Sequence, residues 1–481
     1  MEISKENLIK ISDYVWEIPQ TFRTDMRVPA RIFASEKILE EIFRDRSLWQ
    51  LVNVATLPGI QQSAVVMPDV HEGYGFPIGG VAATLWPDGI ISPGGIGYDI
   101  NCGVRLLLSD LSYEEVRGKL GELTKKLYRE IPSGVGRGGK LKLSAEDLDQ
   151  VLARGAQRMI ETGYGEPEDL DNIESRGMLS NADPAAVSLH AKNRGRDQLG
   201  TIGAGNHFVE VDRVEKIFDA ATANTFGIFK DQVAVLIHTG SRGLGHQVAT
   251  DYLRQMIKAM PIYGIELPDR ELAGVPFASP EGQAYFNAMA AAANFAWANR
   301  QLISWEARNV WKSVFGENKK LNLLYDVAHN IAKIEEHKIG NEIKKVIMHR
   351  KGATRAFPAG HPDVAEKYRS VGQPVIIPGS MGTASYVMAG TPLGMEQTFG
   401  SSCHGAGRKL SRHAAKRQVR GQELRKKLLE EGIYVEAGSL TGLAEEAPAA
   451  YKNIHDVVDV VAGAGIAKKV ALLKPVAVIK G

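Results

Sequence analysis

Five histidines lie where active sites are usually assembled. Each one ends an apolar run or lies in a glycine-rich loop: His71, His207, His238, His329 and His404. Strand ends and the loops beyond them position catalytic side chains on a rigid scaffold. A single histidine in such a place is more often structural than a ligand or catalyst. Five of them together indicate a shared site for nucleophilic or metal chemistry.

The sequence Asp99-Ile-Asn-Cys102 places a carboxylate and a thiol three residues apart in a turn between glycines. Both groups could reach the same one or two metal ions, and His207, His238 and His329 could complete the shell. A thiolate with imidazoles favours Zn²⁺, Fe²⁺ or Co²⁺, whereas a carboxylate with bound water also admits Mn²⁺, so the ligand types leave the metal open. A buried cysteine beside a turn-capping aspartate explains the motif equally well.

Two glycine-rich turns could bind phosphate. The first, at 203–210, presents Asn206, His207 and Glu210 just before a predicted strand, and the second, at 378–385, offers two serine hydroxyls. Backbone N–H groups in such turns can approach an anion closely, because glycine has no Cβ. Turns also need glycine for other reasons, so each loop is a weak indication by itself.

A strongly basic stretch follows the sequence Cys403-His404-Gly405-Ala406-Gly407. Residues 408–427 contain nine lysines and arginines and one acid, Glu423. A basic residue recurs every fourth position from Arg408 to Arg420, which predicts a long helix with one basic stripe. A histidine and two glycines at its start would suit a polyphosphate or an RNA backbone. A solvated basic helix is the alternative for the charge run alone.

Predicted strands and helices surround these motifs. Apolar runs predict strands at 207–214 and 232–241, with His238 close to the end of the second. Further strands are predicted at 321–330, 342–353, 373–390 and 468–481, and the last carries Lys480. Helical spacing covers 113–131 and 144–160, where Ser144 and Asp147 form a predicted cap pair. A long helix is predicted from Ser279-Pro280 to about residue 310.

Length and composition exclude several protein classes. The 481 residues are 44% hydrophobic and 24% charged, as in globular proteins rather than disordered or collagen-like chains. The net charge is only +2, so nucleic-acid binding would need a local basic face. Two cysteines are too few for a disulfide scaffold, and the first residues lack the apolar segment of a secretory signal, so we expect a cytoplasmic protein. No apolar run approaches the roughly 18 residues of a membrane helix.

The order of the predicted elements shows no fixed repeat and no regular alternation of strands and helices. Neither a Rossmann fold nor a barrel is therefore predicted. Length alone suggests two or three units, or one large elaborated domain.

The longest motifs together resemble the RtcB family of RNA-splicing ligases. In the family's order, from Asp69 to Arg408, they read DVHEGYGFPIGG, GGIGYDINCGVR, GAGNHFVEV, IHTGSRGLG, DVAHN, PGSMGTASY and SSCHGAGR. Tyr451 and Lys480 follow in place, so the resemblance covers nearly the whole chain. It implies a single catalytic domain over residues 1–481, with an α+β fold of mixed and antiparallel sheets flanked by helices. This expectation replaces the domain number suggested by length.

The resemblance also implies an activity: joining RNA ends that bear a 2′,3′-cyclic phosphate or a 3′-phosphate to a 5′-hydroxyl, with GTP and two Mn²⁺ ions. His404 would take GMP as a phosphoramidate, and pyrophosphate would leave. GMP would then pass to the RNA 3′-phosphate, and attack by the 5′-hydroxyl would release it. A metal-activated water would first open a cyclic end. The RNA would be tRNA halves in splicing or cleaved RNA in repair, and the protein would be a monomer that an archease could activate.

Site residues carry over from the family by motif. Asp99, Cys102 and His207 would hold one Mn²⁺, and Cys102, His238 and His329 the other. The guanylate would contact Asn206, His207, Phe208, Val209, Glu210, His329, Asn330, Pro378, Gly379, Ser380, Met381, Ser385, His404, Gly405, Ala406, Gly407, Tyr451 and Lys480. RNA phosphates would meet Arg408 and Arg412, with Arg194 and Arg196 as weaker candidates. Asp69 and His71 would belong to the site, without an assigned role.

Two other functions fit parts of the sequence. A metal-dependent phosphoesterase could use the same Asp/Cys/His group to hydrolyse cyclic phosphates, and it would need neither GTP nor a covalent step at His404. An RNA end-binding protein could use the basic stretch alone, but this function would leave Asp99, Cys102 and three histidines without a role.

Overall fold

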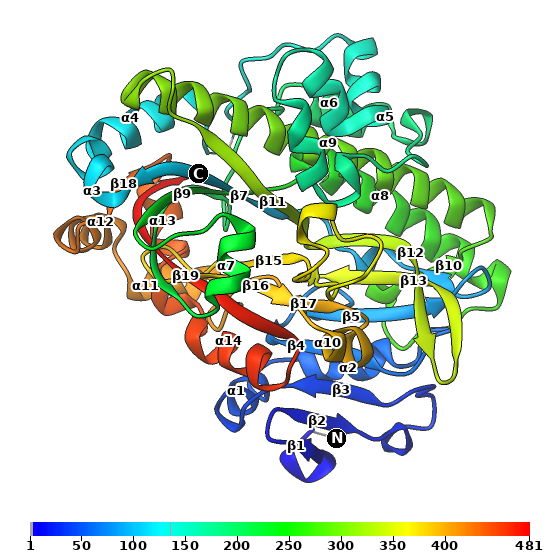
Figure 1. Cartoon of the computed structure of the whole chain (residues 1–481). Coiled ribbons are helices and arrows are strands. Elements are labelled where there is room, and N and C mark those ends of the chain that lie inside the picture. Colours follow the sequence, from blue (N-terminus) through cyan, green and yellow to red (C-terminus); the bar gives the residue numbers. More distant parts are fainter. Residues whose placement is uncertain (1–2, 135) are drawn as a thin grey trace.

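The computed structural model describes residues 3–134 and 136–481 of the chain. Two large sheets dominate this part of the molecule, with helices packed around them (Figure 1). In spatial order, the first sheet contains β1 (Ile9–Ser12), β2 (Val15–Ile18), β3 (Ala30–Phe33), β4 (Ala64–His71), β5 (Ile78–Leu85), β13 (Glu342–Lys351) and β12 (Asn330–Ile339). Its strands pair antiparallel, except for β3 and β4, which are parallel.

The second sheet carries most of the motif residues. Its spatial order is β11 (Leu321–Ala328), β7 (Gly103–Ser112), β9 (Gln232–Thr239), β8 (Phe208–Ile217), β19 (Ala467–Lys480), β16 (Ser385–Gly390) and β15 (Pro374–Ile377), and β18 (Tyr434–Ala437) adds a parallel pairing to β19. Two short pairs join β10 (Val275–Pro276) to β6 (Ile90–Ile91) and β14 (Ala353–Arg355) to β17 (Ser401–Cys403). The mixed, mainly antiparallel sheets confirm the predicted α+β fold.

The helices lie outside the sheets. They are α1 (Glu36–Ile42), α2 (Ser47–Val54), α3 (Tyr113–Val116), α4 (Leu120–Glu130), α5 (Ala145–Glu161), α6 (Leu189–Gly195), α7 (Ala220–Phe226), α8 (Arg242–Ala259), α9 (Pro280–Phe315), α10 (Pro392–Thr398), α11 (Arg412–Gln418), α12 (Gly421–Glu430), α13 (Leu440–Glu445) and α14 (Ile454–Gly463). The long α9 contacts α5, α8 and β9, as seen in the upper half of Figure 1. Most residues of α9 are buried, many of them alanine or aromatic, and the buried set also includes polar residues such as Asn299 and Arg300. A helix that is apolar on most of its surface is expected to be buried.

Most predicted elements are confirmed, including the two caps. Ser144 accepts a hydrogen bond from the backbone N–H of Asp147 at 3.0 Å, and Ser279 caps α9 through the N–H of Gly282 at 3.1 Å. The helix predicted at 113–131 is interrupted instead, because a 3-10 turn at Arg117–Lys119 separates α3 from α4.

The long basic helix predicted from Arg408 is wrong. The helix starts only at Arg412, where Ser411 caps it, and it ends at Gln418. Val419 and Arg420 are extended, so α12 starts as a separate helix at Gly421. A Cβ at Gly421 would lie 2.0 Å from the carbonyl oxygen of Leu440, so close packing against α13 fixes this break. The i+4 stripe therefore does not exist as one surface.

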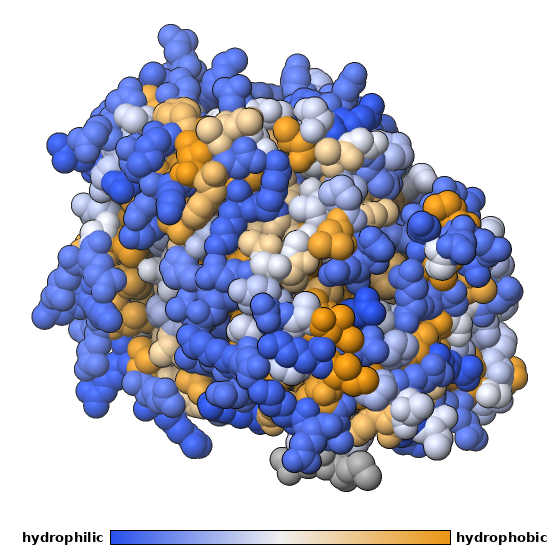
Figure 2. All heavy atoms as spheres, turned by 60° about the horizontal axis from the view of Figure 1, so that its bottom comes forward, coloured by the Kyte–Doolittle hydropathy of each residue, from blue (hydrophilic) through white to orange (hydrophobic). Residues whose placement is uncertain are grey.

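No helix in residues 3–134 or 136–481 is both long enough and apolar enough to span a membrane. The face shown in Figure 2 is mainly hydrophilic, and its hydrophobic side chains are scattered in small groups.

Candidate active site

Both large sheets contribute to one cavity of about 430 Å³. The first sheet supplies His71 and Lys351. The second supplies His238 and Lys480. The loop segments 378–381 and 404–407 form another part of the wall. This volume lies within the range of small-molecule and cofactor sites.

Strand pairing in the second sheet brings the candidate metal ligands to one end. Cys102 directly precedes β7. The first residue of β7 pairs with the residue after His238, in β9, and with the residue before His329, at the end of β11. His207 directly precedes β8, which pairs with the other side of β9. Four adjacent strands thus deliver four donors to the same edge of the sheet.

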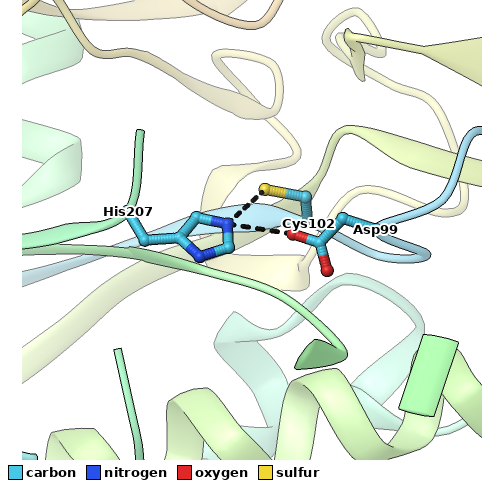
Figure 3. Close-up of side chains that lie close together, drawn as sticks. All are labelled: Asp99, Cys102 and His207. Atoms are coloured by element: carbon cyan, nitrogen blue, oxygen red, sulfur yellow. Dashed lines mark hydrogen bonds and ion pairs between the residues drawn. The ribbon is translucent and has the colours of Figure 1, made fainter. Parts of the chain in front are cut away.

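Asp99, Cys102 and His207 form a compact group (Figure 3). Asn101 adopts a left-handed conformation, and the Cys102 N–H donates to the Asp99 carbonyl at 2.9 Å, which closes the turn. The Nε2 of His207 lies 2.9 Å from Asp99 Oδ2 and 3.5 Å from Cys102 Sγ. One ligand atom from each residue lies within 4.8 Å of the others, as a shared metal ion requires.

A second group of donors shares Cys102. The Nε2 of His238 lies 3.3 Å from Cys102 Sγ, and the rings of His238 and His329 are 5.3 Å apart. The Thr354 hydroxyl lies 2.9 Å from the Nδ1 of His329. The Nε2 of His329 is buried and has no hydrogen-bond partner among the described residues. A buried imidazole nitrogen without a partner, next to the His238 ring, fits a metal ion at this position.

Burial controls the charges of these groups. Burial and the nearby Asp99 raise the pKa of the Cys102 thiol well above its usual value. Burial also lowers the pKa of His238 and of His329 well below the usual value. Burial alone would raise the pKa of Asp99, but hydrogen bonding from His207 leaves it lowered. Neutral imidazoles beside an ionised carboxylate are a suitable donor set for a divalent cation.

His404 lies next to this group with its Nδ1 already bound. Asp69 of β4 accepts from His404 Nδ1 at 2.5 Å and from the His404 backbone N–H at 3.0 Å, both through Oδ2. The ring of His404 lies 5.3 Å from that of His329, and His404 lines the cavity. A carboxylate on Nδ1 keeps the proton there, so the lone pair is on Nε2 and available for nucleophilic attack.

Comparison with known proteins identifies the family. A family model described as tRNA-splicing ligase RtcB matches residues 50–481. The chain is 57% identical to the tRNA-splicing ligase RtcB of Thermococcus kodakarensis, over 98% of this chain and 99% of that protein. The chain belongs to the RtcB family. Proteins of the same name from Archaeoglobus fulgidus and Aeropyrum pernix are 53% and 52% identical over the same shares of the chains.

Most of the residues assigned by the RtcB resemblance meet in the cavity. Those that line it are Asp99, Cys102, Asn206, Phe208, His238, His329, Asn330, Pro378, Gly379, Ser380, Met381, His404, Gly405, Ala406, Gly407, Arg408, Arg412, Tyr451 and Lys480. The remaining ones, which are not among the lining residues, are His207, Val209, Glu210, Ser385, Arg194 and Arg196.

The residues outside the lining have different surroundings. His207 contacts two lining residues directly, and Ser385 accepts from the N–H of Gly379 at 3.2 Å, so it shapes the 378–381 loop. Val209 is buried in the core. Glu210 is buried on β8, opposite Val478 of β19. Arg194 of α6 donates to Gln247 of α8 at 2.8 Å, away from the cavity lining.

Arg408 and Tyr451 lie together, although they are 43 residues apart. The guanidinium of Arg408 covers the Tyr451 ring at 5.0 Å, and its Nη1 donates to the Tyr451 hydroxyl at 3.1 Å. Glu446 accepts from both residues. No sequence pattern indicates Glu446, which lies in an ordinary acidic pair, but it lines the same cavity as Lys480.

Arg300 of α9 is a second residue without a sequence signal. Its Nη1 donates to the carbonyl oxygens of Asn101 at 2.8 Å and Thr239 at 2.9 Å. Its Nε and Nη2 bind the two oxygens of Asp326, both at 2.8 Å. These partners belong to the metal-ligand turn, the end of β9 and β11. One fully buried guanidinium therefore connects the three elements that carry the donors.

We predict that Arg300→Lys weakens binding of a divalent cation at the candidate ligands by about 10- to 100-fold, the usual effect of losing an outer partner of metal ligands. A lysine cannot reproduce the planar fork of the guanidinium. Arg105→Lys is the matched control, because Arg105 is equally buried and binds Asp326, while its other bonds go to Gln301 and Ser304. Calorimetric Mn²⁺ titration and thermal unfolding of both variants test this. Equal losses of affinity would contradict it.

Proposed function

We propose that this chain is an RNA ligase of tRNA splicing that joins RNA 2′,3′-cyclic phosphate or 3′-phosphate ends to 5′-hydroxyl ends. Its family and its full-length relatives, named tRNA-splicing ligases, support the activity. The observation that supports the mechanism best is the position of His404. Its Nδ1 is held by Asp69, and it lines the same cavity as the metal-ligand residues.

The reaction would proceed in three transfers. His404 Nε2 attacks the α-phosphorus of GTP, a P–N bond forms, and pyrophosphate leaves with the electrons of the broken P–O bond. An oxygen of the RNA 3′-phosphate then attacks the same phosphorus, the P–N bond breaks, and GMP is joined to the RNA end. Finally the 5′-hydroxyl oxygen attacks the 3′-phosphorus, its proton is released, and GMP leaves as the new phosphodiester forms.

In this mechanism Asp69 is a positioning residue. It holds the His404 ring by two hydrogen bonds and keeps the proton on Nδ1 in the attacking state. After transfer the ring carries a positive charge, and the adjacent carboxylate stabilises it.

Two Mn²⁺ ions would be held by Asp99, Cys102 and His207 and by Cys102, His238 and His329. Bound there, divalent cations would neutralise the charge that develops on phosphate oxygens during transfer. The buried, unpartnered Nε2 of His329 supports a cation on that side.

The guanine nucleotide would occupy the rest of the cavity. Backbone amides of 378–381 and 405–407 can approach phosphates, because these segments are glycine-containing loops that line the wall. Lys480 is buried there and adds a positive charge. Arg408 and Arg412 line the cavity, and the largely exposed Arg412 could meet RNA phosphates, with Arg408 behind it. Arg194 and Arg196 would act outside the lining.

The chain would work as one catalytic unit and as a monomer, because both sheets that form the cavity belong to the same chain. It would act in the cytoplasm. Cleaved RNA from repair would be a further substrate beside tRNA halves. An archease would act as an activator, not as a part of the site.

Nucleotide affinity should fall as the pH rises through about 8. Burial lowers the pKa of Lys480 to about 8, so its positive charge is present below this pH and lost above it. The loss of a cation facing a polyphosphate should weaken GTP binding, by up to about tenfold for each pH unit. Lys480→Arg stays charged, so its affinity for GTP should fall less than that of the wild-type protein between pH 7 and pH 9. Parallel weakening in both proteins would contradict a role for Lys480.

The test of the proposed function is a ligation assay with purified protein, GTP, Mn²⁺ and two RNA strands, one with a labelled 2′,3′-cyclic phosphate or 3′-phosphate end. A longer labelled product that requires GTP is expected. Conversion of the cyclic end to a 3′-phosphate without GTP, and without joining, would instead support the metal-dependent phosphoesterase.

A further inference from the structure

Three aromatic rings form a row beside the cavity, and the proposed chemistry does not use them. Tyr74 and Tyr98 line the cavity, with ring centroids 5.3 Å apart in an edge-to-face arrangement. Tyr98 stacks on His246, with 4.7 Å between centroids and 22° between the ring planes. His246 is exposed on α8. We call Tyr74, Tyr98 and His246 the aromatic ledge.

Positively charged side chains lie around the outer end of the aromatic ledge. Arg194 donates to Gln247, the residue after His246 on α8, at 2.8 Å, so its guanidinium lies near the outer end of the aromatic ledge. Arg254 is exposed on α8 two turns beyond His246. Glu271, a carboxylate at the Tyr74 end, accepts from the backbone N–H of Gly75 at 2.9 Å.

The aromatic ledge runs from the cavity to the surface. Tyr98 directly precedes Asp99, so the inner end of the aromatic ledge adjoins the metal-ligand group. The outer end of the aromatic ledge is the exposed His246 ring. Burial lowers the pKa of His246, which keeps this ring uncharged at neutral pH and favours stacking over ion pairing. Aromatic rings beside arginines are the usual means of binding single-stranded nucleic acid, because every base has a face that can stack.

Resting on the proposed function, we propose that the aromatic ledge binds the terminal base of an RNA end by stacking, with Arg194 and Arg254 on the adjacent phosphates. Such a contact holds an RNA end in place without reading its sequence, which suits an enzyme that joins ends of different sequence.

The test compares RNA probes with and without the terminal base. One probe has a 5′-hydroxyl end and the other a 3′-phosphate end, and each is labelled at its far end. Each is compared with a control probe of the same sequence that lacks the base at the terminal position. The wild-type protein should bind one intact probe about tenfold more tightly than its abasic counterpart. The probe that shows this difference identifies the RNA end that uses the aromatic ledge.

Variants then locate the effect. His246→Ala should bind intact and abasic probes equally, and His246→Phe should restore the difference, because it restores a stacking ring. Gln255→Ala, at an exposed position on the opposite side of α8, is the matched control and should behave as wild type. The proposal is overturned if the wild-type protein does not distinguish the probes, or if His246→Ala retains the full difference.

Labelling of the protein by GTP requires no RNA, so it tests the proposed function independently of the aromatic ledge. Absence of label in the wild-type protein would count against the proposed function. Label without any effect of the terminal base would count against the aromatic ledge alone.

Discussion

Replacing Asp69 with asparagine should slow transfer of GMP to His404 by about 10³-fold or more. The Asp69 carboxylate accepts from His404 Nδ1 at 2.5 Å, whereas an asparagine amide can present a donor to the same nitrogen. The proton would then move to Nε2, and the attacking lone pair would be lost. An equivalent change of tautomer in a serine protease triad lowers kcat by about 10⁴. Single-turnover labelling with GTP measures the rate.

The Asp69→Asn protein should keep its metal affinity and its thermal stability, because the amide has nearly the same size as the carboxylate. This control separates the loss of the tautomer from damage to the cavity. A labelling rate within tenfold of wild type would show that Asp69 does not control His404.

Cys102→Ser should weaken Mn²⁺ binding by at least about 100-fold and abolish labelling by GTP. Cys102 Sγ lies within 3.5 Å of the Nε2 atoms of both His207 and His238, so one sulfur serves both donor groups. A serine hydroxyl does not ionise in this range and cannot replace a thiolate ligand.

Cys403→Ser is the matched control for this experiment. Cys403 is the only other cysteine in the sequence, it is also buried, and it directly precedes His404. It packs in a hydrophobic cluster instead of facing the metal-ligand residues. Calorimetric titration with Mn²⁺ should therefore give the wild-type affinity for Cys403→Ser. Equal losses in both variants would contradict the bridging role of Cys102.

The candidate metal ligands could be selected from the sequence because each one lies at the end of a recognisable motif. Asp99 and Cys102 share one short turn, and His238 ends a strongly apolar run. Local patterns of this kind indicate which residues lie at the end of a strand. Only the pairing of β7, β9, β8 and β11 then shows that those ends coincide.

The contact between Asp69 and His404 could not be predicted in the same way. Asp69 and His404 are 335 residues apart and meet through the contact of β4 with the segment after β17. No spacing rule connects positions so distant in the chain. The contribution of Arg300 is hidden for a similar reason, since a single arginine in an alanine-rich helix gives no sign of the partners that it will reach.

The basic stretch shows where periodicity fails. Charges at every fourth position predicted one helix, but the break before Gly421 is set by packing against Leu440, which a local pattern cannot contain. Arg408 consequently faces Tyr451 and Glu446 in the cavity instead of continuing a surface stripe.

Covalent labelling by GTP tests whether His404 is the nucleophile. The purified protein is incubated with α-labelled GTP and Mn²⁺ and separated on a denaturing gel, beside a His404→Ala variant with matched metal content. We predict a label that is labile in acid, stable in alkali and absent from the variant, as a histidine phosphoramidate requires. A wild-type protein that binds metal but stays unlabelled, both alone and with an archease added, or a variant that labels equally, would contradict the assignment of His404 as the nucleophile.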